Sequence, residues 1–192
     1  MKKLAFIALA ASVAFASPAM AQSVTGTVDL RGSVASRCFV LPTEGSTFGT
    51  TVDFGELAQT DGTLRTDLST EFSSIGGAGL EARVVCTTPN PTISVDASPL
   101  QTAASADPGY DNSIDYNAHV YVDTVTTADV EFTNDSADPA GAVTAIGGRL
   151  ASNGGNNILI TADDFRTNNS TDLLVASPNY SGQILVVIAP GA

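Results

Sequence analysis

The sequence predicts an all-β protein, an antiparallel β-sandwich of immunoglobulin-like size. Short runs of alternating apolar and polar residues recur every ten or so positions, separated by turn residues. No window of the chain shows the 3.6-residue apolar period of a helix. The length of 192 residues, less a predicted leader, suits one domain. Strand spacing of this kind is typical of β-sandwiches.

The predicted strands are spread along the chain and end at turn residues, such as Pro42 after the first and the turn at 60–62 after the second. The segments 98–114 and 133–140 are rich in Ala, Asp, Pro and Gly, so we expect loops there. The strands are expected at 37–41, 51–57, 79–86, 92–98, 115–123, 141–148, 156–162 and 183–189.

The first 21 residues have the features of a secretion signal peptide. Lys2 and Lys3 precede the apolar run LAFIALAASVAFA, and AMAQ offers a cleavage site after Ala21. The apolar run is too short and too rich in alanine to anchor the chain in a membrane. The short charged and apolar regions of this leader are typical of bacterial signal peptides. We therefore expect the mature chain to act outside the cytoplasm.

The chain is acidic and has no lysine beyond the leader. Twenty Asp and Glu residues outnumber eight Lys and Arg residues, which gives a formal net charge of −12. Phosphate contacts need clustered Lys or Arg, so we expect no nucleic-acid partner. A mature chain without lysine also excludes lysine-dependent catalysis and isopeptide bonds. The simplest role of the acidity is solubility through self-repulsion.

Cys38 and Cys86 are the only cysteines. In an oxidising compartment we expect them to form a disulfide. Closing a loop of roughly 50 residues is worth about 4 kcal/mol in the chain-entropy account. A zinc site made from these cysteines and His119 lacks a fourth ligand.

The stretch that follows the leader alternates strictly. Even positions from 24 to 34 are apolar or glycine, and the odd positions between them are Thr, Asp, Arg or Ser. A hairpin with Gly32-Ser33 as its turn would oppose the two apolar sets poorly. Reading straight through, the even phase continues to Cys38. We therefore expect an extended arm that enters the first core strand without turning.

The last predicted strand, QILVVIA at 183–189, is apolar on both faces. Such a strand is usually covered on both sides. As an exposed edge it would be prone to aggregation, so we expect another strand to pair with it. The arm of another molecule could supply that strand through backbone hydrogen bonds and pockets for alternate side chains.

No motif predicts catalysis, a cofactor or a metal site. The phosphate-loop, G-x-G-x-x-G and G-x-S-x-G patterns are absent. His119 is the only histidine, and we interpret it as an ordinary strand residue. Asp163–Asp164 and the acids between 107 and 115 do not follow calcium-loop spacing, and they do not define a glycosidase. We expect no catalytic residues, no cofactor and no metal ligands.

Four stretches together resemble one family. They are VTGTVDLRGSVASRC at 24–38, ARVVCTTPNPTISVDA at 82–97, YNAHVYVD at 116–123 and YSGQILVVIAP at 180–190. With this arm-to-cysteine spacing and a Tyr-x-Gly before the last strand, the chain resembles the Csu-type archaic chaperone–usher pilins, also called the spore coat protein U domain family. The resemblance covers essentially the whole chain after the leader.

The resemblance implies an incomplete immunoglobulin-like β-sandwich that is completed by donor-strand exchange. In that family a periplasmic chaperone fills the gap, an outer-membrane usher exchanges it, and the N-terminal arm of the next subunit replaces it. The implied function is a structural subunit of a surface pilus, or fimbria, that supports adhesion or biofilm formation. The implied partners are other pilin subunits, the chaperone and the usher, and the implied route runs through the periplasm to the cell surface.

The resemblance also implies a role for particular residues. It divides the chain into the signal peptide at 1–21, an arm at 22–34 and a pilin-like domain at 35–192. Gly26 would be the small residue at a place where the groove cannot take a side chain. The implied donor-strand positions are Val24, Gly26, Val28, Leu30 and Val34, and the implied acceptor edge is Ile184, Val186 and Ile188.

Two other interpretations of the sequence compete with this one. A self-sufficient secreted β-sandwich, either a matrix module or a carbohydrate-binding module, predicts a monomer that survives deletion of residues 22–32. A hydrolase rests only on acidic residues whose positions in space the sequence does not define, and it is the weaker of the two.

Overall fold

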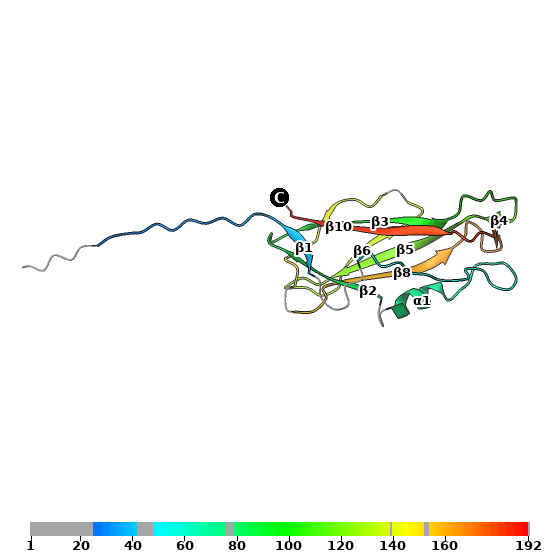
Figure 1. Ribbon diagram of the computed structural model, residues 1–192, viewed down its shortest axis with the longest axis horizontal. Coiled ribbons are helices and arrows are strands. Elements are labelled where there is room, and N and C mark those ends of the chain that lie inside the picture. The colour runs from blue at the N-terminus through cyan, green and yellow to red at the C-terminus, as the bar shows by residue number, and fades with distance from the viewer. Residues whose placement is uncertain (1–24, 42–47, 76–78, 139, 152–153, 192) are drawn as a thin grey trace, which may run out of the picture. The chain divides into compact units, whose positions relative to one another are not determined.

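The computed structural model describes residues 25–41, 48–75, 79–138, 140–151 and 154–191 (Figure 1). The expected signal peptide, its cleavage site and Val24 lie outside the described residues. The chain divides into two units, Met1–Ser33 and Val34–Ala192. Strands hold 43% of it and helix 5%, which confirms the predicted all-β class. In the described ranges, no helix is long and apolar enough to cross a membrane.

The described part of the chain contains ten strands and one short helix. In chain order they are β1 (Cys38–Leu41), α1 (Leu68–Ser74), β2 (Leu80–Cys86), β3 (Thr92–Gln101), β4 (Tyr110–Asp111), β5 (Ser113–Val122), β6 (Val130–Asp135), β7 (Thr144–Ala145), β8 (Ile158–Arg166), β9 (Leu173–Leu174) and β10 (Ser181–Ala189).

β5 organises the antiparallel pairing of the second unit. It pairs with β8 on one edge and with β6 on the other, and its first residues pair with the end of β3. The strand order is β1-β2-β8-β5-β3-β10, with β6 beside β5 and β7 beside β3. In Figure 1, β3 and β10 run together along one side of this unit and β2 and β8 along the other. β4 and β9 form a separate parallel pair.

The core follows the two-residue period of the strands. Alternate residues of β2, β3, β5 and β8 are buried, and Ala118, Val120 and Val122 of β5 are fully enclosed. These strands contribute to one apolar cluster, against which Ile184, Val186 and Ile188 of β10 pack while partly buried. The alternation seen in the sequence therefore reports which side chains face the core.

Several local predictions are wrong. Residues 51–57 form no strand, although Val52 and Phe54 pack against the core as their alternation indicates. Of the predicted strand at 141–148 only the two residues of β7 pair. The segment 98–114 is not one long loop, because β3 continues to Gln101 and β5 begins at Ser113. Likewise, β6 includes the first residues of the predicted loop at 133–140.

The short helix α1 was not expected from the sequence. Its buried residues are Leu68 and Phe72, one helical turn apart. Two apolar residues within seven are too few to show a helical period. The turn expected at 60–62 is present, bracketed by an antiparallel bridge between Ala58 and Leu64.

Residues 25–37 form no strand, helix or turn. The hairpin through Gly32-Ser33 is therefore not formed, and the first strand begins at Cys38. The apolar side chains of the arm are open to solvent: Val28 is 85% exposed, Leu30 91% and Val34 82%.

A disulfide joins Cys38 to Cys86, as expected. The two residues lie opposite each other on the neighbouring strands β1 and β2. The contact continues past β1, because the Arg37 amide donates to Thr87 Oγ1 at 2.9 Å and Thr87 Oγ1 donates to the Ala35 carbonyl at 3.0 Å. β1, which pairs only with β2 in the described residues, is therefore held covalently as well as by its ladder.

Candidate strand-binding groove

β10 is apolar on both faces but paired along one edge. Within the described residues it pairs only with β3, from Ser181 opposite Gln101 to Ala189 opposite Thr92. Its inward side chains pack against the core, whereas Leu185 and Val187 on the other face are each 46% exposed. An edge of this kind presents backbone N–H and C=O groups that can pair with a further strand.

A groove of about 500 Å³ opens beside β10. One wall is formed by residues 182–186 of β10, and the other by residues 48–52 together with Phe54. Side chains from α1, β2, β5 and β8 line the space between the two walls. They are Phe72, Leu80, Tyr116, Ile160, Ala162 and Phe165.

Tyr116 of β5, which lines the groove, connects β3 to the start of β10. Its hydroxyl lies 3.0 Å from the Ser98 carbonyl oxygen and 3.1 Å from that of Gln183, and its ring stacks on Phe165 with centroids 5.3 Å apart. Burial raises the pKa of Tyr116 to about 12, so the hydroxyl stays protonated and donates.

The register of β10 shifts between Ser181 and Gln183, next to the Tyr116 hydroxyl. The residue at this bulge is Gly182. A Cβ there would lie 2.8 Å from the carbonyl oxygens of both Ser98 and Pro99, so no larger residue fits without a shift of the backbone. The bulge therefore depends on glycine.

The second wall belongs to an extended stretch, residues 48–57, which we call the wall segment. Val52 and Phe54 point into the core, while Thr51 and Asp53 are exposed. The Phe54 ring lies 6.2 Å from that of Phe72 and meets Phe165 edge-on at 5.5 Å. The segment has the side-chain alternation of a strand, but within the described residues it has no ladder partner.

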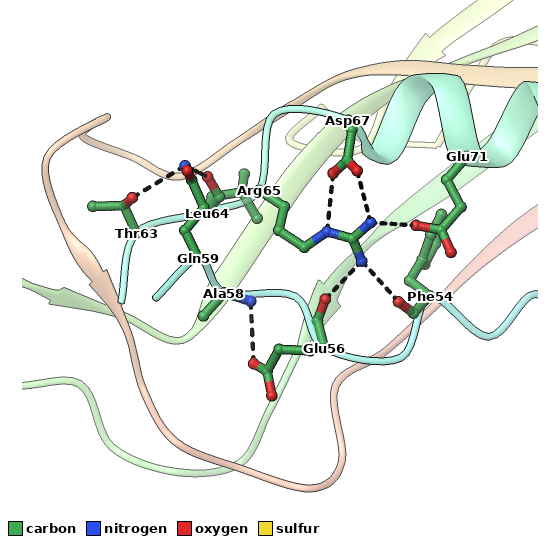
Figure 2. Close-up of polar contacts among 9 residues, drawn as sticks. All are labelled: Phe54, Glu56, Ala58, Gln59, Thr63, Leu64, Arg65, Asp67 and Glu71. Carbon is green, nitrogen blue, oxygen red and sulfur yellow. Dashed lines mark hydrogen bonds and ion pairs between the residues drawn. The ribbon is translucent and has the colours of Figure 1, made fainter. Parts of the chain in front are cut away.

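Arg65 ties the wall segment to α1, as Figure 2 shows. Its Nη1 donates to the carbonyl oxygens of Phe54 and Glu56 at 3.1 and 2.8 Å. Its Nε and Nη2 donate to both carboxylate oxygens of Asp67 at 2.9 and 3.0 Å, and Nη2 also donates to Glu71 Oε2 at 2.7 Å. The hydrogen bond from Arg65 lowers the pKa of Asp67.

This arrangement provides the features that a bound extended strand needs. The free edge of β10 offers a backbone ladder, and the groove offers an apolar floor for alternate side chains. β10 and the wall segment both contribute residues to the lining of the groove.

The structure brings the predicted acceptor residues together with the groove. Ile184 and Val186 line it, and Ile188 lies further along the same face of β10. Comparisons of the chain with protein-family models, with curated proteins and with solved structures found no match. The predicted donor-strand positions Gly26, Val28, Leu30 and Val34 are all exposed.

His119 lies on the outer face of β5, away from the core. Its Nδ1 is 2.7 Å from Glu131 Oε1 on β6, and its Nε2 is 3.0 Å from Asp163 Oδ1 on β8. Both ring nitrogens are engaged, so this side chain links three strands. Among the described residues, no group of three or more His, Cys, Asp or Glu side chains is placed to hold a metal ion.

The sequence reasoning did not identify Phe54, Arg65 or Tyr116 as parts of the groove. The parity of YNAHVYVD places Tyr116 on the same face as Ala118 and Val120, which is a usable signal. The alternation of TVDFGEL likewise places Phe54 inward. Asp67 lies only two residues from Arg65 in the sequence, but the carbonyls of Phe54 and Glu56 are brought to Arg65 by the fold.

Proposed function

We propose that this chain is a structural subunit of a secreted surface pilus, assembled by donor-strand complementation. In this proposal its domain is an incomplete immunoglobulin-like sandwich, and the arm of one subunit enters the groove of the next beside β10. The observation that carries the proposal is that one chain has both an incompletely paired apolar strand and an exposed segment that could pair with it. Within the described residues the apolar strand β10 is paired on one edge only, and the same chain carries an exposed arm with an alternating apolar face.

The energetics favour such an exchange. Val28 and Leu30 are 85% and 91% exposed, and full burial of one such side chain is worth about 1.5–3 kcal/mol. Backbone hydrogen bonds along β10 add to this gain. In isolation the subunit leaves both surfaces exposed, so it needs a partner that covers the groove before assembly. A periplasmic chaperone and an outer-membrane usher, the partners implied by the family resemblance, would fill that need.

A matched pair of arm variants tests the proposal. Val28→Asp places a charge on the apolar face of the arm, whereas Thr27→Asp places the same charge on the polar face one residue away. Both residues are exposed, so neither change should alter the fold of the monomer. We expect Thr27→Asp to polymerise like the unaltered chain and Val28→Asp to lose polymer at least tenfold, because a buried, unpaired carboxylate is costly.

The measurement is the ladder of species in detergent gels of unheated samples, which should collapse to monomer on boiling. Equal ladders from the two variants would remove the arm from the interface. An unaltered chain that stays monomeric even with a chaperone and usher, and unfolds reversibly after deletion of residues 22–32, would instead show a self-sufficient module.

A further inference from the structure

Arg65 supplies the hydrogen bonds that attach the wall segment to other parts of the chain. Within the described residues, Arg65 is the donor of every hydrogen bond that links residues 48–57 to another part of the chain. Its guanidinium binds the carbonyls of Phe54 and Glu56, and its backbone amide donates to the Leu57 carbonyl at 3.0 Å. The remaining hydrogen bonds of the segment are local ones, such as the Gly55 amide to Asp53 Oδ1.

The Arg65 side chain is itself held on two sides. Asp67, at the start of α1, receives two parallel hydrogen bonds from it, and Glu71 in the first turn of that helix receives a third. Asp67 occupies the N-cap position, yet its carboxylate makes no capping bond and is used by Arg65 instead. The start of the helix therefore holds the guanidinium in place. The opposite edge of the guanidinium faces the wall segment (Figure 2).

The planar fork of arginine suits this task and lysine does not. Three nitrogens of one rigid group reach two carboxylates and two carbonyls at once. A lysine ammonium is a single point with three donors and cannot span these acceptors. The Arg65 side chain is 24% exposed and that of Glu71 34%, so this pair is partly shielded from water, whereas Asp67 is 63% exposed.

We propose that Arg65 is a positioning residue for strand capture. It holds the wall segment at the distance from β10 that admits one further strand, and it does so through the carbonyls of Phe54 and Glu56. This inference rests on the proposed function, because it assigns a role in the binding of the donor strand. Arg65 is not among the residues that line the groove. Its effect passes through the placement of Phe54.

The test compares Arg65→Met with Arg166→Met in the mature full-length chain. Arg166 is a matched control, since it also pairs with two carboxylates, Asp135 and Asp164, but donates no bond to the wall segment. Each polymer is incubated in detergent, and the rate of its collapse to monomer is measured. We expect Arg65→Met to collapse at least tenfold faster than the unaltered polymer and Arg166→Met to stay within about twofold.

Hydrogen–deuterium exchange of the polymers locates the effect. In the unaltered polymer, amides of residues 48–57 and of β10 should both be protected. In Arg65→Met the protection of residues 48–57 should fall at least tenfold while that of β10 changes less than twofold. If Arg65→Met does not fold, Arg65→Lys replaces it, with the same local loss expected.

The outcomes separate the two proposals. An unaltered chain that forms no polymer overturns the proposed function and this inference with it. A polymer that forms normally, but in which the Arg65 variants collapse at the rate of Arg166→Met, overturns this inference alone. A uniform loss of protection across β10 and residues 48–57 also overturns it, because that result assigns Arg65 a role in general stability.

Discussion

β5 and β10 are strands of similar length with opposite relations between sequence and surroundings. β5 alternates apolar and polar residues, is paired on both edges, and buries every apolar residue of its inward face. β10 is apolar on both faces, yet within the described residues it is paired on one edge, and its inward residues are only partly buried. β5 has as many neighbours as its composition requires, and β10 has fewer.

The difference teaches that the composition of a strand can call for more cover than its paired neighbours supply. A strand that ends at a solvent edge normally carries charges or proline there, which discourages pairing. β10 carries none between Gln183 and Ala189. Its sequence is suited to a covered position, and residues 182–186 of this strand line the groove.

The largest effect should come from the strand at the other end of the sheet. Within the described residues β1 has one neighbour, as β10 has, but the bond between Cys38 and Cys86 secures it. Replacing both cysteines by Ala should lower the free energy of unfolding by about 4 kcal/mol, because the unfolded chain regains the freedom of the closed loop. Denaturant titration of monomer measures this, and a loss below about 1 kcal/mol would show that β1 needs no covalent support.

A matched pair of core substitutions tests the comparison directly. Val120→Ala in β5 empties a site that is 0% exposed and should cost about 2 kcal/mol. Val186→Ala in β10 makes the same chemical change at a half-buried site and should cost about 1 kcal/mol in the monomer. Denaturant titration of both monomers supplies the values. Equal costs would mean that β10 is already as well covered as β5.

The same pair sharpens the proposal when it is measured in the polymer. A donor strand over the groove would bury Val186 further, so its substitution should speed detergent collapse. Val120 is fully enclosed in the monomer, and its substitution should affect the monomer and the polymer alike. A Val186→Ala polymer as durable as the unaltered one would place the donor strand away from this part of β10.

An element of this fold could be predicted from the sequence where its signal is local to one strand. The alternation of β2, β3 and β5 was readable because burial repeats every two residues along one strand. The same signal was present at 51–57 and gave the inward residues Val52 and Phe54 correctly. It gave the wrong secondary structure, since alternation reports burial while strand assignment also requires a backbone partner. The wall segment has inward side chains but, within the described residues, no backbone partner.

The groove itself was only partly predictable. The two apolar faces of β10 and the phase of the arm are local patterns, and both pointed to strand addition. The clamp at Arg65 joins carbonyls about ten residues upstream to a helix that the sequence did not reveal. The bulge at Gly182 depends on a close approach to Ser98 and Pro99, more than eighty residues away in the chain. Contacts of this kind exist only after the fold is formed.

The smallest effect expected concerns a contact that only a strand with two neighbours can make. His119 on β5 reaches Glu131 on β6 and Asp163 on β8, the two strands that pair with the edges of β5. Burial alone would lower the pKa of His119, but the hydrogen bonds and charges of the two carboxylates outweigh it and raise the pKa above its usual value near 6.5.

A histidine whose pKa is raised by folding stabilises the fold when it is protonated. The stabilisation should be complete below pH of about 6.5 and should be lost as the pH rises through the higher pKa of the folded state. Its size should be below about 1 kcal/mol, because both carboxylates are largely exposed. Denaturant titration of the unaltered chain and of His119→Gln at pH 6 and above pH 8 measures it. Since the chain has no other histidine, the variant should lose this component of the pH dependence. An unchanged pH slope in the variant would mean that the link between β6, β5 and β8 contributes nothing to the free energy of unfolding. β5 would then be held in place by its backbone ladders and its buried face alone.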